Sequence, residues 1–121
     1  MDRHEFEQLV AEALDGLPED IQRMLENVEV TVANLPSPAD LSSAGLQPGQ
    51  LLFGLYQGVP RTHRTSHYGL VLPDKITIYQ QPIERVYRTP EAIRTQVRKT
   101  VLHELAHHMG ISEGRLRELG M

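Results

Sequence analysis

The chain contains no cysteine, and this absence excludes several kinds of site. Without thiols there can be no disulfide scaffold, no thiolate-ligated zinc, no iron–sulfur cluster and no cysteine nucleophile. Any transition-metal site must therefore use imidazole and carboxylate ligands. The six histidines are unevenly placed, and three of them fall within six residues near the end of the sequence, at His103, His107 and His108.

The sequence also lacks long hydrophobic runs and an excess of basic charge. No apolar run approaches the roughly 18 residues that suggest a membrane helix, and no apolar signal segment follows the charged first residues. We therefore expect a cytoplasmic protein with no membrane partner. Twelve basic against 16 acidic residues give a net charge of −4, which argues against nucleic acid as a partner. The sequence leaves open whether the chain forms a homodimer.

The length of 121 residues predicts one domain over 1–121. Apolar residues at helical spacing predict a helix over 3–14, and Pro18 suits the first turn of a second, short helix. Alternation of valine with polar residues predicts a half-buried strand over 28–33. Residues 34–50 hold several prolines and glycines and predict a loop, in which 39–44 are suited to one helical turn.

Two further strands and a long helix are predicted in the second half. The strands lie over 51–56, where Gly54 interrupts the pattern, and over 75–80, and a helical turn is predicted at 82–87. From there the pattern is helical, with a long helix over 90–109 and a short last one. The prediction is an α+β fold, a small sheet packed on helices.

The long helix has recognisable ends. Thr89 is a good N-cap, Pro90 fits the first helical position, and Gly110 suits the residue after the last turn, about Met109. Ser112 can cap the last short helix.

The strongest signal in the sequence is the H-E-x-x-H motif at His103, Glu104 and His107. Two histidines four residues apart lie on one helical face, about 6 Å apart along the axis, so that both imidazoles can bind one zinc ion. Zinc lowers the pKa of a bound water, and Glu104 is placed to accept its proton as general base.

The helical wheel separates this motif from an apolar arc. At about 100° per residue, one arc should be buried and the opposite one should face a cleft. The apolar arc, in which Met109 is expected to pack into the core, contains Val101, Leu102, Leu105, Ala106 and Met109. The opposite arc contains His103, Glu104, His107 and His108.

A catalytic zinc usually has three protein ligands, so a third is needed. Gly110 permits a sharp exit from the helix, and Glu113, six residues after His107, can return toward the metal. The alternative role of Glu113 is that of an acid in the first turn of the last helix, and both roles are compatible. His108 is either a partner that supports the site or an ordinary histidine near a helix end.

Residues 61–68 form a segment rich in donors and cations. In a metal hydrolase, Tyr68, His67 or Arg64 would be suited to stabilise an oxyanion or to bind a substrate carboxylate. The alternative is a solvated loop. A phosphate-binding role has no glycine-rich nucleotide loop to support it.

The motif with its continuation, HELAHHMGISE over 103–113, resembles the site of small bacterial zincin-like metallopeptidases, the mini-zincins with an H-E-x-x-H-x-x-G-x-x-D pattern. The resemblance continues in GLYQGVPR (54–61), LPDKIT (72–77) and RLRELG (115–120). It implies one Zn²⁺ per chain, and it implies a compact α+β fold with the active-site helix under a small sheet.

The resemblance also implies roles for individual residues. His103 and His107 would be zinc ligands and Glu104 the general base. The aspartate of the family pattern falls on Glu113, whose side chain is one methylene longer. The only methionine after the motif is Met121, and the C-terminal tail is a candidate for the apolar floor of the site.

The implied function is zinc-dependent hydrolysis of a peptide or protein substrate. In larger zincins an edge strand pairs with an extended peptide, and 75–80 or 51–56 is suited to this role. One alternative is a peptide- or protein-binding module that keeps the fold with little or no hydrolysis. Another is a metal-dependent hydrolase of a non-peptide substrate.

Overall fold

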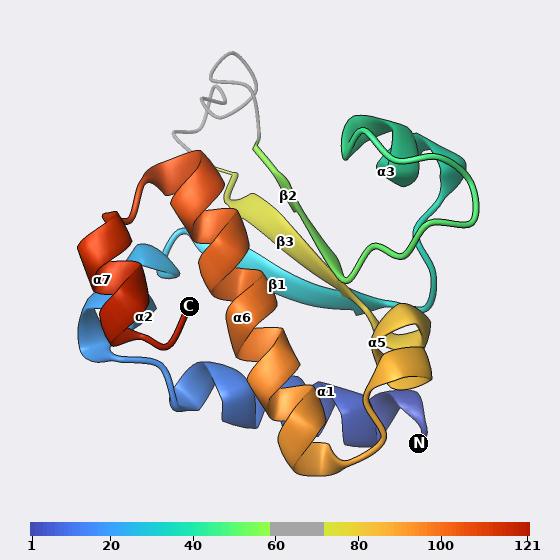
Figure 1. Cartoon of the computed structure of the whole chain (residues 1–121), viewed down its shortest axis with the longest axis horizontal. Coiled ribbons are helices and arrows are strands. Elements are labelled where there is room, and N and C mark those ends of the chain that lie inside the picture. The colour runs from blue at the N-terminus through green and yellow to red at the C-terminus, as the bar shows by residue number, and fades with distance from the viewer. Residues whose placement is uncertain (59–71) are drawn as a thin grey trace.

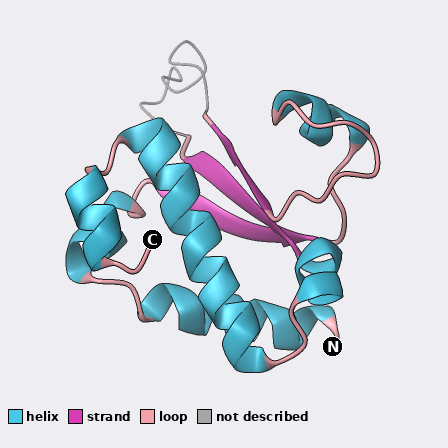
Figure 2. Ribbon diagram, viewed as in Figure 1, coloured by secondary structure: helices cyan, strands magenta, loops and turns pink. Residues whose placement is uncertain are grey.

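The structure, a computed structural model, describes residues 1–58 and 72–121, so the segment 61–68 lies outside the described residues. Figures 1 and 2 show helices gathered around a small sheet. The elements are α1 (Arg3–Asp15), α2 (Glu19–Met24), β1 (Val28–Ala33), α3 (Pro38–Ser43), β2 (Gly54–Gln57), β3 (Asp74–Tyr79), α5 (Gln80–Val86), α6 (Pro90–Met109) and α7 (Glu113–Glu118). The predicted α+β class is confirmed.

Capping side chains set where several of the helices begin. The side chains of Asp2, Ser37, Thr89 and Ser112 each accept a hydrogen bond from a backbone N–H in the first turn of α1, α3, α6 and α7. Such caps satisfy N–H groups that have no partner within the helix. Gly110 ends α6 with φ of 81°, a conformation that favours glycine.

The strands form one mixed sheet in the order β1-β3-β2. β3 pairs with β1 in parallel and with β2 in antiparallel, so Ile76 lies between Val30 and Tyr56. Both edges of β3 are therefore occupied, and the expectation that 75–80 could pair with a peptide is wrong. Within the described part of the chain, β2 is an edge strand that faces the end of α6 (Figure 1).

The hydrophobic core lies where α1 and α6 meet the sheet. Its fully buried members include Phe6, Ile21, Ile76, Ile78, Ile83, Val97, Val101 and Leu105. The prediction that Met109 packs into this core is wrong, because its side chain is 44% exposed. From His107 onward α6 extends past the core, and its last residues all face outward.

Two predicted boundaries shift where strands meet other elements. β2 begins at Gly54 rather than at 51, although the carbonyl of Phe53 still accepts a hydrogen bond of 2.9 Å from the N–H of Tyr79. The chain turns into α5 directly at Gln80, two residues before the predicted helical turn. Among the described residues, no helix combines the length and apolar character needed to cross a membrane.

Candidate functional site

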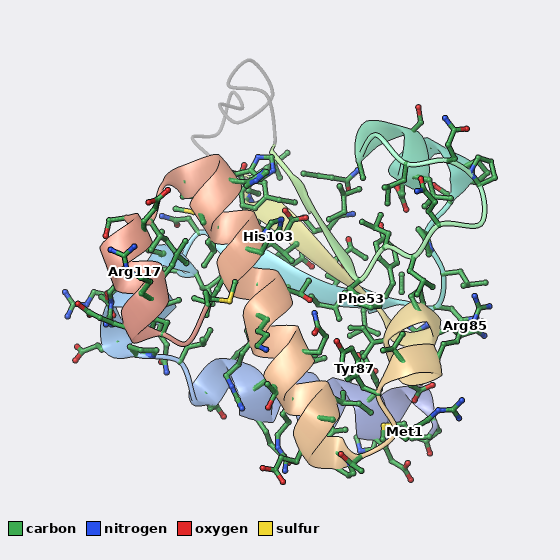
Figure 3. The ribbon with its side chains drawn as sticks, in the orientation of Figure 1. Met1, Phe53, Arg85, Tyr87, His103 and Arg117 are labelled. Atoms are coloured by element: carbon green, nitrogen blue, oxygen red, sulfur yellow. The ribbon has the colours of Figure 1, made fainter. Side chains whose placement is uncertain are left out.

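His103 lies on the face of α6 that is turned toward β2 (Figure 3), and His107 follows one turn later on the same helix. The ring centroids of His103 and His107 are 4.8 Å apart, and the ring planes are tilted by 35°. Both side chains are exposed, and within the described part of the chain neither ring forms a hydrogen bond or ion pair. Their nitrogen atoms are therefore available as ligands.

Burial of the opposite face of α6 fixes this orientation. Val101 and Leu105 are fully buried, and Leu102 is 3% exposed. An α-helix that buries these three side chains turns its opposite face, which carries His103 and His107, away from the core. The predicted separation of an apolar arc from the His/Glu arc is therefore confirmed, with Met109 as the exception.

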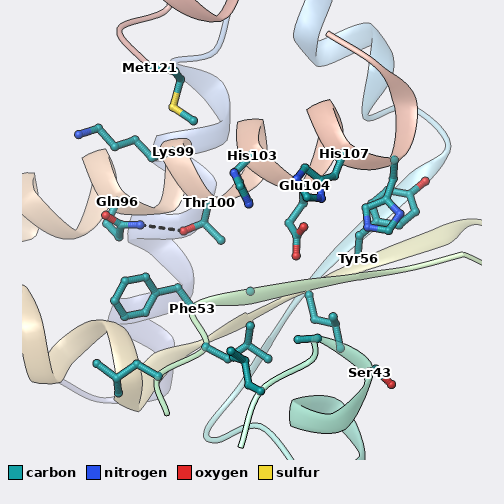
Figure 4. A pocket seen from close by; sticks show the side chains of 17 residues that line it. Ser43, Phe53, Tyr56, Gln96, Lys99, Thr100, His103, Glu104, His107 and Met121 are labelled. Atoms are coloured by element: carbon teal, nitrogen blue, oxygen red, sulfur yellow. Dashed lines mark hydrogen bonds between the residues drawn. The ribbon is translucent and has the colours of Figure 1, made fainter.

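The histidine face of α6 opens onto a cavity of about 700 Å³ (Figure 4). All four residues predicted for the cleft face line it: His103, Glu104, His107 and His108. The wall opposite α6 is largely apolar and includes Ala44, Leu46, Leu51, Leu52, Phe53 and Leu55. Met121 also lines the cavity, which agrees with the expectation that the C-terminal tail contributes an apolar surface.

β2 approaches α6 closely at two positions. A Cβ atom at Gly54 would lie 2.5 Å from Cγ2 of Thr100, so only glycine allows this approach. Two residues on, the ring of Tyr56 stacks on that of His108, with centroids 4.5 Å apart and planes 7° apart. The Tyr56 hydroxyl donates a hydrogen bond to Asp74 at the start of β3.

The sequence alone did not predict these two contacts between β2 and α6. The sequence held one signal, the glycine within a strand pattern, which often marks a close approach of another segment. Tyr56 carried no such signal, because its stacking partner is 52 positions away in the sequence. For His108, the structure places the ring both in the cavity wall and against the edge strand.

A hydrogen bond attaches α3, which contributes one end of the cavity wall. The hydroxyl of Tyr79 donates to Oδ2 of Asp40 over 2.9 Å. Burial raises the pKa of Tyr79, and so do this hydrogen bond and the negative charges of Asp40 and Glu104. The half-buried Glu104 therefore acts electrostatically on Tyr79, at the end of the central strand β3.

Glu113 does not join the histidine pair in this structure. It is exposed in the first turn of α7, where the hydroxyl of Ser112 accepts a hydrogen bond of 3.1 Å from the N–H of Arg115. Its alternative role, an acid at a helix start, is the one observed, and its role as a ligand stays a prediction. Across 1–58 and 72–121, no group of three or more His, Asp or Glu side chains is arranged to hold a metal ion. Arg64, His67 and Tyr68 lie outside the described residues.

A family model described as "zincin-like metallopeptidase" matches residues 25–121, and this match includes the sheet, α6 and α7. The chain belongs to this zincin-like family. The resemblance inferred from the motif is thereby confirmed at the level of the family.

A solved structure of a conserved hypothetical protein from Thermo thermophilus is similar to this zincin-like chain. The TM-score is 0.56 and the sequence identity 28%, over 89% of this chain and 94% of the other. The description of that protein as conserved and hypothetical states no activity. No curated protein sequence matches significantly.

The side chains of this zincin-like site fit part of a zinc centre. Imidazole is a common zinc ligand, and the neighbouring, unbonded rings of His103 and His107 would supply two ligands to one ion. Glu113 is the candidate for the third position by sequence, and it would have to approach from the start of α7. The donor chemistry therefore fits zinc.

Proposed function

We propose that this zincin-like chain is a zinc-dependent peptidase acting on a peptide or protein. The observation that carries the proposal is the pairing of His103 and His107, 4.8 Å apart, with Glu104 beside them in one cavity. Two imidazoles and a neighbouring carboxylate would supply two of the three usual protein ligands of a catalytic zinc and the general base of metal-assisted hydrolysis. When bound, zinc would polarise the substrate carbonyl and make a water molecule acidic.

Glu104 would act as the general base. Its side chain is half-buried, lines the cavity and forms no hydrogen bond or ion pair in the described part of the chain. The carboxylate is therefore free to accept the proton of the attacking water and to pass it to the leaving amine. Figure 4 shows its carboxylate directed away from α6 toward the strands.

The edge strand β2 would bind the substrate backbone. β2 is the last strand of the described sheet and lines the cavity together with the motif. The outer edge of such a strand can pair with an extended peptide through main-chain hydrogen bonds. The apolar wall near Leu46 and Leu52 favours a substrate with an apolar side chain close to the cleaved bond.

The test compares the wild type with Glu104→Gln under full zinc occupancy. Loss of the base should lower kcat/KM by about 100-fold or more while zinc binding is retained. Glu91→Gln is the matched control, because Glu91 is an exposed residue in the first turn of the same helix. The activity of the wild type and of both variants is measured as cleavage of a mixed peptide pool, followed by mass spectrometry. Equal cleavage by Glu104→Gln and the wild type would rule out this mechanism.

The position of Glu113 favours a second candidate, a peptide-binding module without hydrolysis. The described residues do not bring a third ligand to the histidine pair. A chain that holds zinc weakly could still bind peptides along β2. Binding of peptides without cleavage, at saturating zinc, would support the module and contradict the peptidase.

A further inference from the structure

The stacked rings of Tyr56 and His108 join the edge strand to the last turn of the motif helix. Tyr56 is 7% exposed, and its hydroxyl is held by Asp74 on β3, so the ring has little freedom. His108 packs flat on this ring at 4.5 Å. The position next to His108 in the chain is His107, the second histidine of the pair.

Within the part of the chain that the structure describes, the last turn of α6 buries none of its own side chains, and the next contact with the core is that of Ile111, beyond Gly110. Residues 107–110 are all exposed, whereas the preceding turn packs through the fully buried Leu105. The helix then ends at Gly110, whose N–H bonds to the carbonyl of Leu105. The stack is therefore a lateral contact of the last turn itself, between the core contacts of Leu105 and Ile111.

We propose that Tyr56 and His108 form a clamp that fixes the last turn of α6 against β2 and thereby positions His107 for metal binding. This inference rests on the proposed zinc binding. Both are positioning residues, because they act through His107. Groups that orient a metal ligand typically change metal affinity by about 10- to 100-fold when removed.

The clamp also sets the spacing between the two parts of the site. Gly54 packs on Thr100 at one end of the motif, and Tyr56 stacks on His108 at the other. His103, Glu104 and His107 lie between these two contacts along the helix. A substrate paired with β2 would thus be held at a fixed distance from the histidine pair.

The experiment tests whether the stacking of two flat rings is what matters, or the polar groups that the Tyr56 and His108 rings carry. Tyr56→Leu and His108→Ala remove the stack, whereas Tyr56→Phe and His108→Phe keep two flat rings. Phe53→Leu is the matched control, because Phe53 lines the same cavity but packs on Tyr87 instead, with ring centroids 6.0 Å apart (Figure 3).

Zinc dissociation constants are measured by competition with a chelator. We expect Tyr56→Leu and His108→Ala to raise the constant by about tenfold, and the other three variants to stay within about twofold of the wild type. Wild-type affinity in both stack-removing variants would overturn the clamp. A failure of His108→Phe to restore what His108→Ala loses would also overturn it, because the imidazole nitrogens would then be the functional groups.

Amide hydrogen exchange in the metal-free chain tests the clamp independently of zinc. The amides of residues 105–109 should exchange faster in Tyr56→Leu and His108→Ala than in the wild type and Phe53→Leu. Unchanged exchange would overturn the clamp even if the wild type binds zinc and cleaves peptides. Faster exchange in a chain whose wild type binds no zinc would support the contact but reject the proposed function.

Discussion

At the scale of single residues, Gly54 determines how closely β2 can approach α6. An added Cβ atom would meet Thr100 Cγ2 at 2.5 Å and the carbonyl oxygen of Thr77 at 3.2 Å. The backbone oxygen cannot move without disturbing the pairing of β2 with β3. No side chain therefore fits at position 54 between β2 and α6, and substitution of Gly54 tests this close approach.

We predict that Gly54→Ala lowers the free energy of unfolding by about 1–3 kcal/mol through overpacking. Adding Thr100→Ser should restore part of this loss, because it removes Cγ2 and keeps the hydroxyl that accepts a hydrogen bond from Gln96. Gly58→Ala is the control, since its nearest neighbour would be 3.8 Å away. Urea unfolding measures all three, and equal stability of Gly54→Ala and the wild type would contradict the close approach.

Residue patterns predicted the motif face of α6 well because helical periodicity is local. Val101 and Leu105 on one side and His103 and His107 on the other follow from spacing alone. Met109 has the same spacing but is exposed, because periodicity does not tell where the core ends along a helix. The stacking partner of His108 could not be predicted from the sequence either, because its position depends on how strands that are distant in the sequence pair.

At the scale of elements, α3 is held weakly. None of its residues is buried, and the hydrogen bond from Tyr79 to Asp40 ties it to the end of β3. Burial raises the pKa of Asp40, but hydrogen bonds from Ser37 and Tyr79 outweigh burial and hold that pKa below its ordinary value of 3.8. The contribution of Asp40 to stability is therefore present above about pH 4 and is lost as the pH falls through the lower folded value.

We predict that Tyr79→Phe lowers the free energy of unfolding at pH 7 by about 1 kcal/mol and speeds amide exchange in α3. The difference from the wild type should shrink as Asp40 becomes protonated in acid. Ser37→Ala is a useful comparison, because it weakens the cap of α3 and keeps the bond from Tyr79. Unchanged exchange of α3 in Tyr79→Phe would show that other contacts hold it.

A two-point contact attaches α7, which carries Glu113, to the start of α2. Arg115 donates to both carboxylate oxygens of Asp20, over 2.8 and 3.1 Å. The hydrogen bond from Arg115 holds the pKa of Asp20 below its ordinary value of 3.8. Protonation of Asp20 as the pH falls through that lower value should therefore release α7.

We predict that Arg115→Lys speeds amide exchange over 113–118, because lysine cannot reproduce a two-point contact with a carboxylate. Arg117→Lys, a change to an exposed arginine on the same helix, should leave exchange unchanged. The difference between Arg115→Lys and the wild type should disappear in acid. Equal exchange in both variants at pH 7 would contradict the role of this contact.

At the scale of the whole molecule, element types followed from the sequence but their arrangement did not. The strand over 28–33 and the helix over 90–109 have the predicted limits, because alternation, caps and Gly110 are local signals. The order β1-β3-β2 depends on which strands pair over long distances, and no local pattern encodes it. For the same reason the edge strand could be predicted only as one of two alternatives.

Whether the proposed metal site is complete also depends on the whole chain, since a third ligand would have to come from another element. Zinc at 100 times its dissociation constant should raise the free energy of unfolding by about 2.7 kcal/mol, and His103→Ala or His107→Ala should abolish most of this gain. Because imidazole must be neutral to bind zinc, the gain should also fall in acid.

Glu113 provides the decisive variant of this experiment. If α7 swings its carboxylate to the histidine pair when zinc binds, Glu113→Ala should weaken zinc binding by about tenfold or more, as loss of a ligand requires. Glu113→Asp, the residue of the family pattern, should retain most of the affinity, and Glu91→Ala on α6 serves as the control. Chelator competition and urea unfolding with and without zinc measure the effect. Unchanged affinity and unchanged stabilisation in Glu113→Ala would remove Glu113 from the site, and the third position would then belong to another group.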